Sequence, residues 1–172
     1  MKRRRLPSLI LIPLCGLLAL SPISPLAANE GAPDKPVLAV SGKIRNANSE
    51  AQFVFDMAML ETLPQHSFRT GTPWYADTRE FTGPLLRDVL SAAGAQGQML
   101  TARALNDYKV VIPVRDATAY NVIVARLMDG KPMPVRDKGP LFIIYPFDDH
   151  SELRSQTYYG RSVWQLREIQ VK

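Results

Sequence analysis

The chain has a single cysteine, Cys15, among its 172 residues. Because Cys15 lies in an apolar N-terminal segment, the remainder can form no disulfide and offers no thiolate nucleophile or soft metal ligand. Histidine is scarce as well: His66 and His150 are the only two, and they are too far apart in the sequence for a metal-ligand spacing. The composition therefore argues against thiol chemistry and against a histidine-rich metal centre.

A basic surface is also missing once the N-terminus is set aside. The full chain has 21 basic and 16 acidic residues and a net charge of +5. Residues 1–28 contain four of the basic residues and no acidic one, so the remainder has 17 basic against 16 acidic residues, a net charge of +1. We therefore expect no nucleic-acid partner, because such binding depends on clustered positive charge.

Residues 1–28 have the three parts of a secretory signal peptide. Lys2–Arg5 is basic, Leu6–Leu20 is apolar, and Ala28 is a small residue at the expected cleavage site. The apolar run contains two prolines and is shorter than the roughly 20 residues of a membrane-spanning helix. We expect cleavage after Ala28 and a periplasmic location, with an uncleaved anchor as the alternative.

Behind the signal peptide, residues 29–36 are rich in Gly, Pro and charge, which predicts a flexible leader. Residues 37–172 are long enough for one domain with its own core. They contain no internal repeat, and we expect them to form a single unit.

Hydrophobic patterns predict many short strands and a few short helices, an α+β domain with mixed β-sheets. The strands are expected at 37–44, 51–55, around Phe68, 99–105, 108–114, 121–127, 141–147 and 163–171, with a hairpin at Asp129–Gly130 and an edge strand containing Pro132. The helices are expected at 57–63, capped by Asp56, and from Pro84 to a stop at Gly94, with a turn at 158–161. Trp164 alternates within the last strand, which favours a core position.

The stretch 69–83 (RTGTPWYADTREFTG) has neither helical nor alternating strand periodicity. Exposed aromatic side chains are costly in water, so Trp74 and Tyr75 have two readings. Their rings either turn inward as part of the core or form a flat wall for a flat ligand. Further along the chain, Asp107 also has two readings: it either binds that ligand or belongs to a turn at the start of a strand.

Four segments together resemble the oxidoreductase molybdopterin-binding domain of the sulfite oxidase family. They are FTGPLLRDVLSAAGA, ALNDYKVVIPV, LMDGKPMPVRDKGPLFIIYPFDD and SVWQLREIQV, in this order along the chain. The resemblance covers residues 37–172 and implies the mixed α+β fold of that family, with a pterin cleft lined by loops.

Catalytic members of the family bind molybdenum through a cysteine about ten residues before the first of these motifs. Here that region reads Thr70-Gly71-Thr72-Pro73-Trp74, and a hydroxyl does not replace a thiolate on a soft metal centre. We therefore expect no sulfite-oxidase-like turnover and no tightly bound cofactor. The start of the chain, Arg3-Arg4-Arg5-Leu6-Pro7, indicates Sec export rather than the twin-arginine route of folded molybdenum enzymes.

The chain is similar to a small exported branch of the family that lacks the cysteine. This resemblance implies a reduced pterin as ligand, and as partner the periplasmic region of a membrane-bound enzyme of cyclic-di-GMP turnover. The expected ligand-binding residues are Arg69, Thr72, Trp74, Tyr75, Arg79, Asp107, Tyr108 and Arg161. In this hypothesis the aromatic rings stack on the pterin, the carboxylate accepts from its amino edge, and an arginine meets its oxo group.

Two other functions remain open from the sequence. One is a molybdopterin-dependent oxidoreductase, which would carry molybdopterin despite the missing cysteine. The other is a scaffold that docks on a membrane sensor without any ligand.

Overall fold

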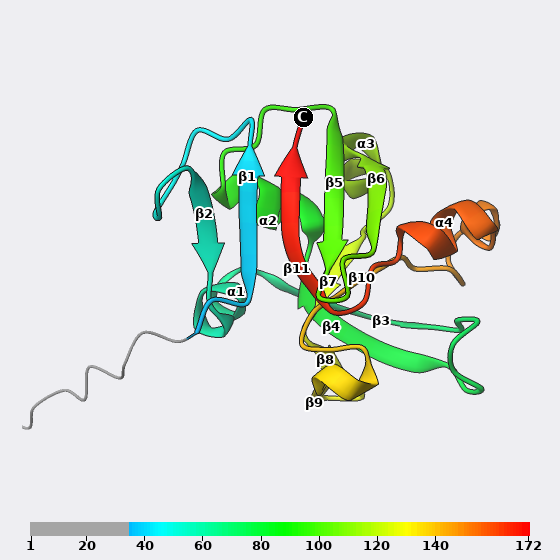
Figure 1. Cartoon of the computed structure of the whole chain (residues 1–172). Helices are drawn as coiled ribbons and strands as arrows, with labels where there is room; N and C mark the ends of the chain where they lie inside the picture. The colour runs from blue at the N-terminus through cyan, green and yellow to red at the C-terminus, as the bar shows by residue number, and fades with distance from the viewer. Residues whose placement is uncertain (1–34) are drawn as a thin grey trace, which may run out of the picture. The chain divides into compact units, whose positions relative to one another are not determined.

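A computed structural model of the protein describes residues 35–172 (Figure 1). The predicted signal peptide and most of the predicted leader lie outside this range. Within it, the α+β prediction is confirmed: short helices alternate with the strands of several β-sheets. None of the helices in this part of the chain has the length and apolar character needed to cross a membrane.

The largest sheet has five strands in the order β2-β1-β11-β5-β6. Its strands are β1 (Leu38–Gly42), β2 (Gln52–Phe55), β5 (Met99–Ala104), β6 (Lys109–Pro113) and β11 (Leu166–Val171). The first and last strands, β1 and β11, pair in parallel, whereas the other neighbours are antiparallel. The two ends of the domain therefore meet inside one sheet, and the strands predicted from periodicity are confirmed.

A second sheet has the order β3-β4-β8-β9, and β7 pairs with β10 in a third. Their strands are β3 (Gln65–Thr70), β4 (Arg79–Pro84), β7 (Ile123–Ala125), β8 (Leu127–Met128), β9 (Lys131–Pro132) and β10 (Phe142–Ile144). Asp129 and Gly130 both have positive φ, at 50° and 73°, as a two-residue hairpin requires. The predicted hairpin and its proline-containing edge strand are therefore confirmed.

The first two helices are α1 (Met57–Thr62) and α2 (Leu86–Ala92). The Asp56 carboxylate accepts from the Met59 N–H at 2.7 Å, so the predicted cap is confirmed. The prediction that Pro84 begins α2 is wrong: Pro84 is the last residue of β4, opposite Gln65. Gly94, with φ +64°, follows the helix as the predicted stop.

Two further helices, α3 (Val114–Ala119) and α4 (Gln156–Arg161), were not predicted, and the turn expected at 158–161 is wrong because it lies in α4. Short 3-10 turns cover Val135–Asp137 and Ser151–Leu153. The last strand begins at Leu166 rather than Val163, and its register shifts between Leu166 and Glu168. This bulge buries both Leu166 and Ile169, which strict alternation would place on opposite faces.

The core lies against one face of the five-stranded sheet, and α2 lies behind that sheet in Figure 1. Every residue from Leu141 to Phe147 is buried, as predicted for a strand covered on both faces. The loop expected over 69–83 is shorter, because β3 and β4 occupy its ends and leave residues 71–78. This loop carries Trp74 and Tyr75 across the outside of the core.

Candidate functional site

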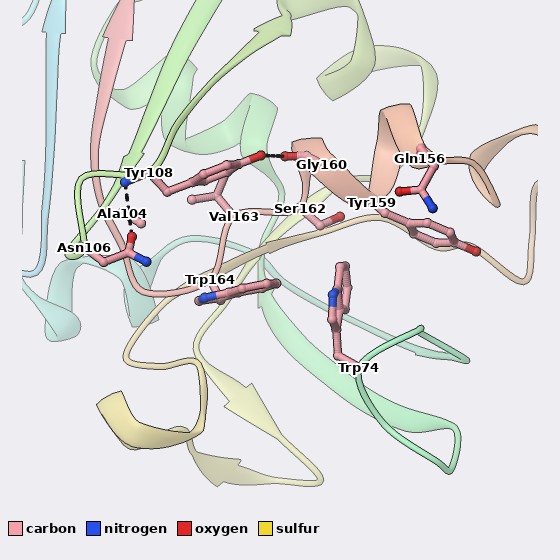
Figure 2. Close-up of a pocket in the computed structure, with 10 residues that line it drawn as sticks. All are labelled: Trp74, Ala104, Asn106, Tyr108, Gln156, Tyr159, Gly160, Ser162, Val163 and Trp164. Atoms are coloured by element: carbon pink, nitrogen blue, oxygen red, sulfur yellow. Dashed lines mark hydrogen bonds between the residues drawn. The ribbon is translucent and has the colours of Figure 1, made fainter.

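A cavity of about 300 Å³ opens where three separate segments of the chain meet (Figure 2). The segments are the loop 71–78, the turn between β5 and β6, and the stretch from α4 to the start of β11. The lining residues are Trp74, Ala104, Asn106, Tyr108, Gln156, Tyr159, Gly160, Ser162, Val163 and Trp164. Its size lies at the lower end of the roughly 300–1,000 Å³ of small-molecule sites.

Four of the ten lining residues are aromatic: Trp74, Tyr108, Tyr159 and Trp164. The Trp74 ring meets the Trp164 ring edge-to-face, with centroids 5.5 Å apart, and the Tyr159 ring at 6.0 Å. Trp74 is half-buried, so it packs against the core and lines the cavity at the same time. The core position favoured for Trp164 is therefore incomplete: its ring lies before β11 and also faces the cavity. In Figure 2, Tyr108 and Trp164 lie on opposite sides of the cavity, each seen nearly edge-on.

The turn between β5 and β6 brings Asn106 and Tyr108 to the cavity. Asp107 has φ +65°, and its N–H donates to the Ala104 carbonyl at 3.1 Å, which makes a three-residue hairpin loop. The Asn106 Oδ1 accepts from the Tyr108 N–H at 3.1 Å, an Asx turn. Because the oxygen is used in this way, the Nδ2 of Asn106 is left to face a ligand.

Helix α4 forms the opposite wall with Gln156, Tyr159 and Gly160. The Tyr108 hydroxyl donates to the Gly160 carbonyl at 2.8 Å and so ties the hairpin turn to the helix across the cavity. The Ser162 hydroxyl donates to the Tyr158 carbonyl at 3.0 Å. Within residues 35–172, the side chain of Gln156 makes no hydrogen bond and is available to a ligand.

The cavity is electrically neutral. None of the residues that line it in the described part of the chain carries a formal charge at pH 7. Their polar groups are carboxamides, hydroxyls, indole N–H groups and backbone. Such a lining suits an uncharged, flat ligand with hydrogen-bonding edges, because a phosphate or carboxylate finds no cationic partner among the lining residues. Outside the lining, the Lys138 Nζ lies over the Trp164 ring, 5.5 Å from its centroid.

The loop that carries Trp74 is fastened to the turn after β10. The Asp148 carboxylate accepts from the Gly71 N–H at 2.7 Å, and the buried Thr70 hydroxyl accepts from the Asp148 N–H at 3.1 Å. Arg154, which follows the 3-10 turn Ser151–Leu153, donates from its guanidinium to the Phe147 carbonyl at 2.9 Å. These bonds hold the base of the loop beside the cavity.

Charged side chains that the sequence suggested for the ligand are engaged elsewhere. Asp107 pairs with Arg103 at 2.8 Å and Arg167 at 3.2 Å, and this neighbouring Arg103 guanidinium lowers the pKa of the Asp107 carboxyl. The two sequence neighbours of Asp107, Asn106 and Tyr108, line the cavity instead. Of the two readings of Asp107, the turn describes its place in the structure.

The arginines named from the sequence also pair with acidic residues. They form the pairs Arg69–Glu80 at 3.9 Å, Arg79–Asp129 at 3.0 Å and Arg161–Asp116 at 2.9 Å. Tyr75 turns away from the lining and packs against Phe81, and burial raises the pKa of its hydroxyl. Thr72 accepts from the Trp74 N–H at 3.4 Å, inside the loop. Of the predicted site residues, the structure therefore brings Trp74 and Tyr108 to the cavity.

Behind α4 lies a buried node of Asp116, Tyr145 and Arg161. The Asp116 carboxylate is 1% exposed and accepts from the Tyr145 hydroxyl at 3.0 Å and the Arg161 guanidinium at 2.9 Å. Burial raises the pKa of Tyr145 well above its usual value, and the Asp116 charge adds to this effect. Arg161 thus anchors α4 to α3 instead of facing the cavity.

Sequence reasoning missed Asn106 and Gln156 as lining residues, whereas the pair of tyrosines beside Arg161 indicated a lid or partner patch that includes Tyr159. Asn106 could have been found, because an Asn two residues before a strand is typical of an Asx turn at its start. Gln156 carries no comparable local signal, since it reaches the cavity only through the fold of α4.

The molybdenum centre that the resemblance implies needs a thiolate ligand near residues 70–74. The Thr70 hydroxyl already accepts from the Asp148 N–H, and the region where a thiolate is needed contains only threonine hydroxyls. In residues 35–172 no group of three or more His, Cys, Asp or Glu side chains could hold a metal ion. The cavity lining also lacks a cation for a molybdopterin phosphate. The residues present do not fit this cofactor.

Comparison with known proteins gives one clear relationship. The profile of the oxidoreductase molybdopterin binding domain matches residues 58–148, which is more than half of the chain. No curated protein matches the sequence. The matched range contains the loop with Trp74, the β5–β6 turn and the buried run before Asp148. The chain therefore belongs to the oxidoreductase molybdopterin-binding domain family, of the sulfite oxidase-like superfamily.

Proposed function

We propose that this protein binds a reduced pterin in the periplasm without catalysing a reaction, as a ligand sensor. The observation that carries the proposal is the neutral, aromatic cavity in a domain of the molybdopterin-binding family that lacks the metal-binding cysteine. A pterin is a flat bicycle with an amide-like edge, and it is the organic part of the cofactor that this family binds.

Stacking and hydrogen bonding are sufficient for useful affinity. Stacking of a heterocycle on an aromatic side chain contributes roughly 1–3 kcal/mol for each contact. Trp164 and Tyr108 provide two such faces, and the Asn106 and Gln156 carboxamides provide hydrogen bonds. Micromolar binding needs about 8 kcal/mol net of the cost of ordering the ligand, and these contacts are the contribution that the lining residues make towards it.

The location and partner rest on other observations. Residues 1–28 support export, and the resemblance to the small exported branch supports a membrane-bound cyclic-di-GMP signalling enzyme as partner. In this proposal the pterin-bound protein contacts the periplasmic region of that enzyme and changes its activity.

Calorimetry of the purified protein with tetrahydropterins tests the proposal directly. We expect one binding site, micromolar affinity or tighter, and a change in tryptophan fluorescence on binding. Absence of both heat and fluorescence change across a series of reduced pterins would overturn it. Metal analysis of protein from its native host is the second measurement: stoichiometric molybdenum would favour the oxidoreductase instead.

A further inference from the structure

We infer that Asn106 and Gln156 determine the ligand specificity of the cavity, by reading the hydrogen-bonding edge of an uncharged heterocycle and disfavouring anionic ones. This inference rests on the proposed pterin binding and adds to it the residues that select the ligand. The two side chains come from different segments and lie at separate places around the cavity (Figure 2).

In the Asn106 carboxamide, the turn occupies the oxygen and leaves the nitrogen free to donate a hydrogen bond. Its Oδ1 must face the Tyr108 N–H, because only the oxygen of a carboxamide can accept that bond. The turn therefore fixes the side chain, with Nδ2 available as a donor. This donor suits an oxo group or ring nitrogen of a heterocycle, and ligand binding costs little ordering of a side chain already held in place.

Gln156 supplies the complementary chemistry. Its carboxamide has an acceptor beside a donor, and no other side chain in residues 35–172 hydrogen-bonds to it. A lactam edge of a pterin also has an N–H beside a carbonyl, so the two can pair through two bonds, as Asn and Gln do with adenine. A ligand edge with two donors or two acceptors side by side leaves one of these groups unpaired, whereas the carboxamide can turn to meet either order of one donor and one acceptor.

The surrounding charges sharpen this selection. Asp107, the charged residue next to Asn106, is neutralised by Arg103 and Arg167. An anionic substituent placed in the cavity therefore loses water and gains no cation among the lining residues, although the Lys138 Nζ lies over the Trp164 ring, 5.5 Å from its centroid. We expect the wild-type protein to bind 6-methylpterin at least tenfold more tightly than pterin-6-carboxylate.

Two substitutions test the roles of the carboxamides. Asn106→Asp keeps the oxygen that accepts from Tyr108 and replaces only the donor, so it preserves the turn while weakening 6-methylpterin binding at least tenfold. Gln156→Lys removes the amide and adds a cation at the rim, so we expect it to lower or reverse the preference for 6-methylpterin over pterin-6-carboxylate. Gln170→Lys, at an exposed position in β11 away from the cavity, is the matched charge control.

Calorimetric titration of the four proteins with both pterins gives distinct outcomes, and thermal melting verifies that each variant is folded. A changed affinity for Asn106→Asp together with a changed selectivity for Gln156→Lys, both absent from Gln170→Lys, supports the inference. Wild-type binding with unchanged affinity and selectivity in both variants overturns the inference and leaves the proposed function standing. Failure of the wild-type protein to bind either of these oxidised pterins overturns the inference, and failure to bind the tetrahydropterins as well overturns the proposed function.

Discussion

The polar groups on the two sides of helix α4 differ in charge and in whether they are already paired within the protein. On the cavity side the lining residues are neutral, and the Gln156 carboxamide is left available to a ligand, whereas the Gly160 carbonyl is already bonded to the Tyr108 hydroxyl. On the other side, the buried node of Asp116, Tyr145 and Arg161 contains charges that are fully paired with each other. The same short helix thus has one side committed to holding the fold and one side open for binding.

This difference shows why charge alone is a poor guide to the site. A buried charge is costly unless it is paired, so Arg161 pairs with the Asp116 carboxylate and is not available to a ligand. A neutral carboxamide at a cavity rim costs little when water solvates it, so Asn106 can remain available. Predictions on the two sides should therefore separate into effects on stability and effects on binding.

The largest effect is expected in the buried node. Asp116→Ala leaves the largely buried Arg161 guanidinium without its partner, which should lower the free energy of unfolding by about 3–5 kcal/mol. Urea unfolding measures this change. The double variant Asp116→Leu/Arg161→Met removes both charges and should recover only part of the loss, because the buried Tyr145 hydroxyl still lacks its acceptor. A loss below about 1 kcal/mol for Asp116→Ala would mean that the pair does not anchor α4.

Tyr145→Phe tests the neutral member of the same node. The variant loses a hydrogen bond to a charged group, so we expect its free energy of unfolding to fall by roughly 1.5–3 kcal/mol near neutral pH.

The pH dependence of this difference has a definite sign. Because the folded pKa of Tyr145 is raised, its stabilisation is complete below the unfolded pKa of about 10 and is lost as the pH rises above that value towards the folded pKa. The stability difference between wild type and Tyr145→Phe should therefore shrink in alkaline urea titrations. A difference that stays constant from pH 8 to pH 11 would contradict the raised pKa.

The sequence predicts the framework of the domain well, because the framework depends on local patterns. Alternating apolar residues predict β6, Asp56 predicts the start of α1, and Asp129–Gly130 predicts the β8–β9 hairpin. The failures have equally local causes. The bulge near Leu166 breaks the alternation in β11, and α4 lacks a capping side-chain bond and contains a glycine.

The site is harder to predict, because it depends on partners that are distant in the sequence. Arg161 resembles a ligand-binding arginine beside two tyrosines, but Asp116, 45 positions earlier in the chain, pairs with it. The available polar group of the β5–β6 turn lies on Asn106 rather than Asp107, a shift of one residue that depends on the αL conformation of Asp107. Neither outcome follows from composition or periodicity.

On the cavity side, Trp74→Ala should affect ligand binding rather than folding. We expect the affinity for a reduced pterin to fall at least tenfold, or about 1.4 kcal/mol, because the ring that closes the cavity beside Trp164 is lost. Calorimetry measures the affinity, and thermal melting measures the fold. Trp74→Phe, which retains a ring, should have an affinity between those of the wild-type protein and Trp74→Ala. A domain that melts on Trp74→Ala would show that the side chain serves the core alone.

The smallest effect is expected for Asp129→Asn, which removes one charge from a surface pair with Arg79. Asn keeps the oxygen that accepts from the Glu80 N–H and tolerates the φ of 50° at this position. The loss in the free energy of unfolding should therefore be below about 1 kcal/mol, with no change in pterin affinity.

The pH dependence of this pair also has a definite sign. The bond from the Glu80 N–H and the Arg79 charge lower the pKa of Asp129, so its stabilisation is present above pH about 4 and is lost as the pH falls through the folded pKa. Urea midpoints from pH 7 to pH 3 should converge for the two proteins at the acidic end. A loss as large as that of Asp116→Ala would erase the distinction between exposed and buried charge on which the comparison of the two sides of α4 depends.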